Sequence, residues 1–499
     1  MENFMIGINE LLSVEAMLAI FGGVVWGTIG GIIPGINGTV AMALLLPFTW
    51  GMSPSLAVMM LTGTYCGAEY GGSIPAILIG TPGTNAAAAT VFDGYEMHKK
   101  GQSGLALYLA LYSSVFGGLF STLCLILLAI PLASIALAFG PSEYFLLALT
   151  GLTLICSLGE DNVLKGIWAG LFGILLSFIG FDPFTGFPRF TFGLMVLSDG
   201  LEMVPLMMGL FAISEVFRQA ESFHITDTLK FDEENDISMP RWRTLFSFLR
   251  VNIIGSIIGV IVGVMPGAGA TVASFLSYSW FKRTSRDPDS FGKGNPIGVA
   301  APESANNAVT GGAMVPLLSL GIPGSNSTAI MLGGLIIHNI TPGPMLFVDH
   351  PEIPYGVFSS MFVANFFLIF VGIVCIKAAV KITTISKPAL FASIITLVFT
   401  GAFSFSAESF DVLVALICGI IGFGMRKFGL PHAATVLGFV LGFIMEANLR
   451  RALILTRGSY LRVFTMSGIT MTLTIIVVVS LLLPMLGRIK KNFVVKKVY

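Results

Sequence analysis

Residues 23–39 read GVVWGTIGGIIPGINGT, and residues 255–271 read GSIIGVIVGVMPGAGAT. Both stretches place a Pro-Gly pair at the end of a ladder of glycines that recur at every fourth position. The two pairs are Pro34-Gly35 and Pro266-Gly267. A helix break that is duplicated inside apolar sequence is typical of membrane carriers built from repeats, whose sites lie where the helices break.

A second pair of similar blocks follows the first pair. PAILIGTPGTN begins at Pro75, and PLLSLGIPGSN begins at Pro316. We name residues 80–85 the first tip and residues 321–327 the second tip. Each tip gathers small hydroxyl and amide side chains between apolar flanks, which predicts a helical hairpin that dips into the membrane. Two such tips facing each other would enclose a site near the membrane midplane.

The composition places the chain in a lipid bilayer. Hydrophobic residues make up 55% and charged residues 11% of the sequence, and the mean hydropathy is +0.88. Soluble domains carry about 25% charged residues, so this chain has too few charges to cover its apolar surface in water. The net charge is zero, which gives no indication of a nucleic-acid partner. No basic residue precedes the first apolar run, so no cleaved signal peptide is expected.

Apolar segments define the candidate membrane spans, because a spanning helix needs about 20 apolar residues. The candidates are 16–33, 104–130, 143–158, 166–181, 197–217, 247–265, 357–376, 389–403, 411–424 and 466–487. Shorter or interrupted apolar pieces lie at 38–48, 55–80, 84–92, 271–281, 298–320, 325–337 and 432–446. The sequence therefore predicts an all-α polytopic membrane protein of about 12 membrane segments plus re-entrant hairpins.

Loop charges predict that the two halves have opposite orientations, because Lys and Arg stay in cytoplasmic loops. Residues 47–55 have no basic residue, whereas the corresponding residues 281–296 have four. The next loop reverses this pattern, since residues 93–104 carry two lysines and the corresponding residues 341–356 carry none. Equivalent loops are therefore expected on opposite sides of the membrane, as in inverted-topology repeats.

The predicted domains follow from this inversion. Residues 1–217 form the first repeat, and residues 247–487 form the second, inverted repeat. The basic segments 218–246 and 488–499 are expected to be a cytoplasmic linker and a cytoplasmic tail. The N-terminus is then expected in the periplasm, and the C-terminus in the cytoplasm.

Residues 446–462 fit this scheme poorly, because they carry four arginines on the side that the span order places outside. These are Arg450, Arg451, Arg457 and Arg462. Either the apolar piece 432–446 is re-entrant, or the arginines have a function on the outer side. A further interpretation is an interfacial helix whose basic face meets lipid headgroups.

The Pro-Gly breaks are candidate sites for a coupling ion. Proline ends the helical hydrogen bonding, and the carbonyl groups freed there can bind a cation. This interpretation assigns Pro34, Gly35, Pro266 and Gly267 to ion coupling. It leaves the glycine ladders mainly to close helix packing.

Two acidic residues lie in apolar surroundings, where charges are rare and usually functional. Glu69 lies in TGTYCGAEYGGS, and Glu303 lies in AAPESANNAVTGG. Either is a candidate for coupling to sodium or protons, and the alternative is a carboxylate that caps the start of a hairpin. Asp93 and Glu96 instead share a segment with two lysines and are expected to be solvated.

Neutral hydroxyl and amide groups near the breaks and tips are candidates for binding a carboxylate-bearing substrate. Together with exposed backbone amides, such groups bind an anion without a permanent countercharge, which helps a carrier that must release its substrate. Helix capping is the alternative role for Asn37 and Thr39. The candidates are Asn37, Thr39, Ser73, Thr84, Asn85, Asn306, Asn307, Ser325, Asn326 and Ser327.

Five long motifs together resemble a known family. They are GxxPGxNGT, EYGGSIPAILIGTPGTNAAAATVFDG, FGKGxxxGVAAPESANNAVTGG, PLLSLGIPGSNSTAIMLGGL and EANLRRALIL. The chain resembles the large membrane subunit of the tripartite tricarboxylate transporters, the TctA type, over nearly its whole length. It departs from the family's pattern at Glu446-Ala447-Asn448, where the family would have two acids before the asparagine.

The resemblance implies uptake of citrate-like or other carboxylates across the bacterial inner membrane, driven by a sodium or proton gradient. It also implies a small membrane subunit of the TctB type and a periplasmic solute-binding protein of the TctC type. The segregation of broken pieces from intact spans favours alternating access of the elevator type. No cofactor is expected, and no metal beyond a transported sodium.

Other function classes have less support in the sequence. No GxxxxGK[ST] motif for a nucleotide is present, and neither HExxH nor GxSxG for a hydrolase, so we do not expect an enzyme. A channel remains an alternative, because paired hairpins also build pores. A carboxylate carrier that works without a binding protein is the nearer alternative.

Overall fold

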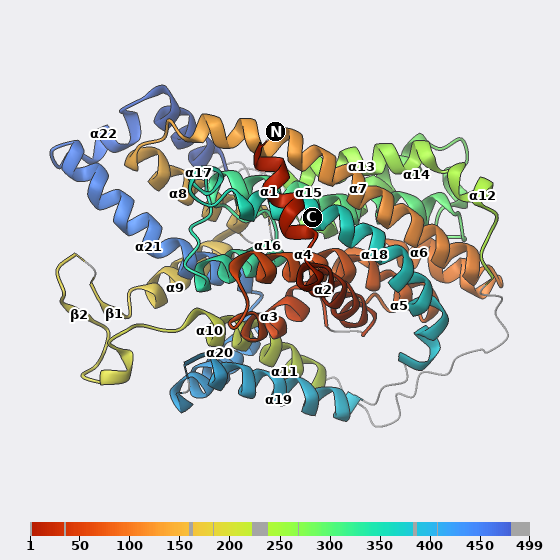
Figure 1. Ribbon diagram of the computed structural model, residues 1–499, viewed down its shortest axis with the longest axis horizontal. Helices are drawn as coiled ribbons and strands as arrows, with labels where there is room; N and C mark the ends of the chain where they lie inside the picture. The colour runs from red at the N-terminus through yellow and green to blue at the C-terminus, as the bar shows by residue number, and fades with distance from the viewer. Residues whose placement is uncertain are drawn as a thin grey trace, which may run out of the picture.

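The computed structural model describes residues 2–33, 36–158, 163–182, 184–221, 238–267, 269–382, 387–406 and 408–480. Within these residues the chain is almost entirely helical (Figure 1), and a single two-stranded antiparallel hairpin pairs Gly180 with Arg189. The Pro34-Gly35 pair and the basic tail lie outside the described residues, as does most of the linker.

The first half contains α1 (Glu2–Leu11), α2 (Val14–Ile32), α3 (Gly38–Thr49), α4 (Pro54–Gly71), α5 (Ser73–Leu78), the 3-10 turn η1 (Asn85–Ala87), α6 (Ala88–Lys99), α7 (Ser103–Ala136), α8 (Pro141–Leu158), α9 (Val163–Ser177), β1 (Gly180–Phe181), β2 (Pro188–Arg189), η2 (Met195–Leu197), α10 (Met203–Met208), the π-helical turn η3 (Gly209–Ile213) and α11 (Ser214–Glu221). The second half contains α12 (Trp242–Phe246), α13 (Leu249–Val264), α14 (Gly269–Thr284), η4 (Pro288–Ser290), α15 (Ile297–Leu320), α16 (Asn326–Ile337), α17 (Leu346–Asp349), α18 (Glu352–Ile382), α19 (Lys387–Ser406), α20 (Ser409–Lys427), α21 (His432–Leu455) and α22 (Tyr460–Thr465). A further apolar helix covers Gly468–Ser480.

Within the part of the chain that the structure describes, five helices are long and apolar enough to cross a membrane, namely α2, α7, α18, α20 and α21. Shorter apolar helices stand beside them, among them α3, α9, α13 and α16. This confirms an all-α polytopic membrane protein. The expected total of about 12 membrane segments stays a prediction, because several of these helices are shorter than a bilayer.

Two segments that the sequence marks as interrupted are continuous helices. Helix α15 runs through Pro302 and Pro316 without a break, and α21 runs from the apolar piece 432–446 straight into the arginine segment. The ring of a helical proline crowds the carbonyl four residues earlier, and for Pro316 that residue is Gly312, which packs against α13. Neighbouring helices hold such a helix together where an isolated one would kink.

The glycine ladders bring helix backbones into direct contact. Helix α2 packs along α4, and α13 packs along α15. A Cβ atom on Gly27 would overlap the Thr64 carbonyl oxygen, and one on Gly259 would overlap the Ala305 carbonyl oxygen. Only glycine permits this approach, so the packing role expected for the ladders is confirmed.

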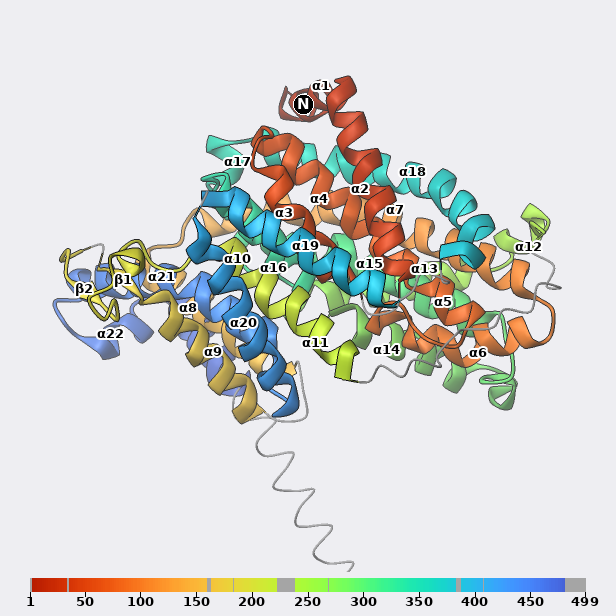
Figure 2. The ribbon, with the colours of Figure 1, turned by 90° about the horizontal axis from the view of Figure 1, so that it is seen from below.

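The helices fall into two groups. We name α2–α6 with α13–α16 the core unit, and α8–α11 with α19–α21 the outer unit. Helices α7 and α18 cover the core unit, where α7 packs on α15 and α18 packs on α4. In the outer unit α21 packs on α8 and α9, while α20 packs on α10, η3 and α11 (Figure 2). Each of these contacts joins a helix of the first half to a helix of the second half.

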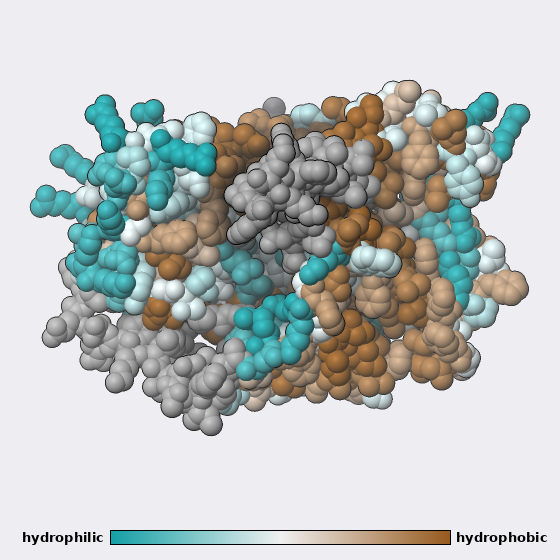
Figure 3. All heavy atoms as spheres, turned by 180° about the vertical axis from the view of Figure 1, so that it is seen from behind, coloured by the Kyte–Doolittle hydropathy of each residue, from teal (hydrophilic) through white to brown (hydrophobic). Residues whose placement is uncertain are grey.

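Charged side chains gather at one end of the molecule. Figure 3 shows hydrophilic side chains at its left edge, where α6 and α14 lie, beside a broad apolar surface. The exposed basic residues there include Lys99, Lys100, Lys282, Arg283 and Lys293. The large apolar surface next to them fits lipid contact.

Asp93 is not solvated, contrary to the expectation. It is fully buried in α6, and its Oδ1 accepts hydrogen bonds from the backbone N–H groups of Gly292, Gly294 and Asn295 at 2.7–2.9 Å. The hydroxyl of Tyr278 donates to its other oxygen at 2.8 Å. The carboxylate therefore holds the loop between α14 and α15 against the first half of the chain. The sequence did not indicate this role, because the two lysines nearby suggested a solvated segment.

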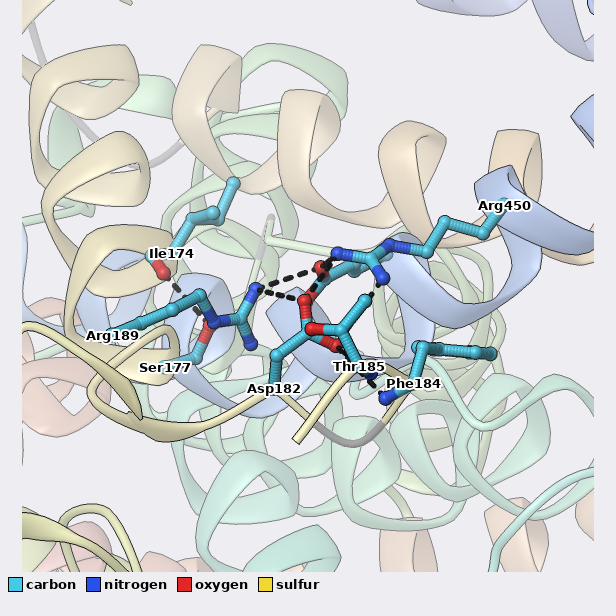
Figure 4. A network of polar contacts seen from close by, with 8 residues as sticks. Ile174, Ser177, Asp182, Phe184, Thr185, Arg189 and Arg450 are labelled. Atoms are coloured by element: carbon cyan, nitrogen blue, oxygen red, sulfur yellow. Dashed lines mark hydrogen bonds and ion pairs between the residues drawn. The ribbon is translucent and has the colours of Figure 1, made fainter. Parts of the chain in front are cut away.

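Arg450 is part of an ion-pair network and does not face lipid. Its guanidinium lies 2.8 Å from Asp182 and 2.5 Å from Glu446, and Arg189 of β2 lies 2.8 Å from Glu446 (Figure 4). The Arg450 guanidinium, together with the backbone N–H of Phe184, holds the pKa of Asp182 well below its usual range. The network fastens the β-hairpin to α21, so the interpretation as a lipid-facing arginine is wrong at this position.

Replacing Gly27 by alanine should destabilise the protein by about 1–3 kcal/mol, because the new methyl group must push α4 away from α2. Thermal unfolding in detergent, followed by size-exclusion chromatography, measures the effect. Gly22→Ala on the same helix is the matched control, since nothing lies within 4 Å of its Cβ position. Equal melting temperatures for the two variants would contradict the packing role.

Candidate functional site

A cavity of about 680 Å³ lies between the core unit and the outer unit. Both tips reach it, as does the chain after each Pro-Gly pair. Its walls come from both halves of the sequence. Residues predicted for the site that line it are Asn37, Thr39, Glu69, Thr84, Asn85, Gly267, Ser325, Asn326 and Ser327.

Four helical segments begin at this cavity. They are α3, η1, α14 and α16, and the residues at or next to their first turns line the wall. A helix N-terminus carries unpaired N–H groups and the positive end of the helix dipole. Their convergence makes the cavity favourable for an anion.

Three of the predicted polar residues cap these helices. The Asn37 Oδ1 accepts from the Val40 N–H at 2.9 Å at the start of α3, and Thr84 caps η1. Ser325 forms a capping box with Thr328 at the start of α16. Capping is therefore the observed role of the Asn37 oxygen, although the residue also lines the cavity.

Asn85 and Asn326 occupy equivalent places in the two tips. Both side chains are exposed to the cavity, and neither makes a hydrogen bond in the described part of the chain. Each follows a capping residue, Thr84 or Ser325, which fixes the backbone and leaves the next amide free. These two amides are the polar groups best placed to bind a ligand from opposite sides.

The second tip is tied to the first half of the chain by hydroxyl groups. The Tyr65 hydroxyl lies 2.9 Å from the Ser325 Oγ, and the Thr39 Oγ1 lies 3.4 Å from the Ser327 Oγ. Thr39 thus contacts the opposite tip and does not cap α3. Each tip also contacts a glycine ladder, since Gly83 packs against Gly31 and Gly324 packs against Gly263.

Several predicted residues lie outside the cavity wall. Ser73 is buried and donates to the Tyr70 carbonyl oxygen at 2.8 Å. Asn306 and Asn307 are buried in α15 and donate to the carbonyl oxygens of Glu69 and Cys66, at 3.0 and 3.5 Å. The Oδ1 atoms of both asparagines have no partner in the described structure. These two amides therefore link α15 to α4 behind the site.

The two acidic candidates, Glu69 and Glu303, differ in their access to the cavity. Glu69 lines the cavity and is 7% exposed. Glu303 is fully buried in the middle of α15 and accepts hydrogen bonds from Thr90 at 2.5 Å and Ser114 at 3.1 Å. Pro266 does not line the wall although Gly267 does, and Pro34 and Gly35 lie outside the described residues.

The sequence-based prediction missed a cationic wall. Arg218 of α11 and Arg426 of α20 line the cavity on the outer unit and share one carboxylate, Glu215, at 2.5 and 2.8 Å. Both guanidinium groups thus pair with Glu215, and the Arg426 Nε is buried without a partner among the described residues. Arg218 begins the basic linker and Arg426 lies in the last turn of an apolar helix, where basic residues are expected for topology alone, so nothing in the sequence marked them as site residues.

Comparison with known proteins identifies the family of the chain. The family model described as "Tripartite tricarboxylate transporter TctA family" matches residues 17–437. A protein of Agrobacterium vitis described as an uncharacterized 52.8 kDa protein in the TAR-I ttuC' 3' region is 39% identical over 497 residues, 98% of this chain and 97% of its own length. Another from the same organism, in the TAR-II ttuC' 3' region, is 38% identical over 228 residues, 46% of this chain and 94% of its own length. No solved structure matches the chain. The chain belongs to the tripartite tricarboxylate transporter TctA family.

Proposed function

We propose that this protein takes up a carboxylate by secondary active transport, and that the cavity between the tips is its substrate site. The observation that carries the proposal is the convergence of four helix starts and two free amides on one cavity. The Arg426 guanidinium on the opposite wall, whose Nε has no partner among the described residues, adds a cationic donor for an anion. Tricarboxylates such as citrate, and smaller dicarboxylates or monocarboxylates, all fit this chemistry.

Glu69 supplies a route to ion coupling. A charged Glu69 on the cavity wall repels a carboxylate that enters the same cavity. A sodium ion or proton bound at Glu69 would remove that repulsion and so favour the carboxylate. Binding of the cation and of the anion would then each strengthen the other, as linkage requires. The partly freed backbone at Gly267 and the buried Glu303 are further candidates for the coupling ion.

We further propose that the two repeats are inverted. In support, the loop after α6 lies against the loop before α15, where the Lys100 ammonium donates to the Lys293 carbonyl oxygen. In the second repeat, residues 341–356 correspond to the loop after α6. They lie around α17, at the other end of the molecule (Figure 1). The basic end then faces the cytoplasm of a bacterial cell, with the N-terminus in the periplasm.

Transport would follow an elevator-type movement of the core unit against the outer unit. Arg218, Gly429 and Leu430 line the cavity, and the proposed orientation assigns their side of the molecule to the cytoplasm. The second tip is closed, because Ile322 is buried and a Cβ on Gly151 of α8 would lie 2.6 Å from its Cγ2. Thr81, the equivalent residue of the first tip, is exposed. This asymmetry fits an inward-facing state.

Family membership adds two partners to the proposal. A small membrane subunit of the TctB type would complete the membrane complex, and a periplasmic binding protein of the TctC type would deliver the carboxylate to the outer face. The exposed surface of the β-hairpin, which includes Phe187, Phe192 and Met195, faces outward in the proposed orientation. A saturable, ion-dependent uptake that requires the binding protein separates this proposal from a channel and from a carrier that works alone.

Uptake into proteoliposomes containing the complex tests the proposal, with citrate, succinate and acetate as probes and imposed sodium or proton gradients. Asn85→Ala and Asn326→Ala should each lower kcat/KM by about tenfold, because each removes an uncommitted amide from the cavity. Gln102→Ala, an exposed amide outside the cavity, is the control. Passive flux by the wild type without a gradient, or unchanged uptake in both tip variants, would contradict the proposed site.

Glu69→Gln should abolish ion-driven accumulation while retaining exchange of citrate across the membrane. The amide keeps the size of the side chain but holds no negative charge for a cation to neutralise. The measurement compares net uptake under a gradient with counterflow exchange. Accumulation at the wild-type level would remove Glu69 from the coupling mechanism.

The double variant Ile322→Cys with Gly151→Cys, in a protein without its 5 native cysteines, should form a disulfide on oxidation. We expect the disulfide to stop uptake, and its reduction to restore uptake. The cross-link would hold the second tip against α8 and so prevent the movement. Each single-cysteine variant under the same oxidation serves as control. Full uptake by the cross-linked protein would exclude movement of this tip relative to the outer unit.

A further inference from the structure

A second cavity, of about 640 Å³, lies on the other side of the second tip. Gly321 and Ile322 line it, whereas Ser325 and Asn326 of the same tip line the cavity described above. The tip is thus a thin partition between two cavities. The remaining wall comes from α8, α21 and the loop that leads to α17. We name this space the outer cavity.

The partition is sealed by apolar packing. Ile322 is 4% exposed and belongs to a cluster with Phe145 and Leu146 of α8 and Ala452 of α21. Gly321 has φ +72° and lies against Pro342, so the backbone turns sharply at the seal. The tip therefore lies between the two cavities, and its outward movement would open a path from one to the other.

The outer cavity contains one cationic side chain that the fold does not use. Arg451 is exposed, lines the wall, and forms no ion pair in the described part of the chain. Its neighbour Arg450 is by contrast fully engaged with Asp182 and Glu446. Both arginines lie on α21. The ion-pair network explains the presence of Arg450, but it does not include Arg451.

Other polar groups in the outer cavity suit an anion with hydroxyl or carboxylate groups. Asn339, Thr341 and Asn448 line the wall and offer amide and hydroxyl donors. The acidic side chain there is Asp349, and His350 pairs with Glu352 at 3.1 Å. No ion pair joins Asp349 to Arg451 among the described residues, so the guanidinium stays available to a ligand.

We propose that the outer cavity is a second carboxylate-binding site, in which Arg451 binds the substrate before it passes the second tip. The proposal rests on the proposed function, because it gives a carboxylate carrier a receiving site on its outer face. Arg451 binds a carboxylate through charge-assisted hydrogen bonds, and Asn448, one turn earlier on α21, lines the same wall. Opening of the Ile322 seal then admits the anion to the tips.

A labelling experiment on the purified protein separates the two sites. In the background without native cysteines, Asn448→Cys reports on the outer cavity and Asn85→Cys on the inner one. A membrane-impermeant maleimide labels each, with and without citrate, succinate or acetate. We expect at least one carboxylate to slow labelling of both cysteines, and Arg451→Gln to abolish protection at position 448 only.

Transport kinetics give the second readout. Arg451→Gln should raise KM for the transported carboxylate by about tenfold and leave kcat within about twofold, because the lost contact precedes the moving step. Arg451→Lys should recover part of the loss, since it restores the charge but not the bidentate geometry. Arg462→Gln, an exposed arginine of α22 outside the cavity, is the matched control.

The outcomes distinguish the two proposals. Protection of position 85 without protection of position 448, or an unchanged KM for Arg451→Gln, overturns the outer site and leaves the proposed function intact. Protection of position 448 that depends on Arg451, in a protein that transports no carboxylate, supports the outer site and overturns the proposed function. Absence of protection at both positions, together with absence of uptake, overturns both.

Discussion

Direct contact between helix backbones at glycine is the constraint on which the rest of this structure depends. Along α2 and α13, most ladder glycines let a carbonyl oxygen of the neighbouring helix approach to a distance that no Cβ could occupy, as at Gly23, Gly27 and Gly259. The same requirement recurs at the tips, where Gly83 and Gly324 fit beneath Gly31 and Gly263. Because both tips are held in this way, the four helix starts meet at one cavity.

The polar chemistry of the cavity follows from that backbone arrangement. Asn37, Thr84 and Ser325 satisfy the first N–H groups of their helices, which leaves Asn85 and Asn326 free in the tips. The opposite wall belongs to the outer unit and carries Arg218 and Arg426 around Glu215. The cavity therefore combines weak neutral donors on the core unit with a fixed charge on the outer unit, and a relative movement of the two units would change how strongly an anion is held.

Local patterns were sufficient to find many of the polar residues that line the cavity. The two tips, the Pro-Gly breaks and Glu69 were predicted from duplicated motifs and apolar context, because a membrane tolerates a broken helix only where protein or a wet cavity surrounds the break. The roles within the site were harder to predict. Thr39 binds across to Ser327, and Asn306 and Asn307 join α15 to α4, because these contacts link residues far apart in the chain. Asp93 was misjudged for the same reason, since its partners are the N–H groups of a loop in the other half.

The sequence alone determined that this is an all-helical membrane protein with duplicated breaks and polar tips, since composition and spacing are properties of the chain itself. Tertiary structure decided which charges belong together. Arg426 joins the site while Arg450 fastens a hairpin and Arg451 has no ion-pair partner among the described residues, although all three occupy apolar helices. Whether an arginine near a helix end meets a carboxylate, lipid or a cavity depends on which helix packs beside it, and that packing is set by long-range contacts.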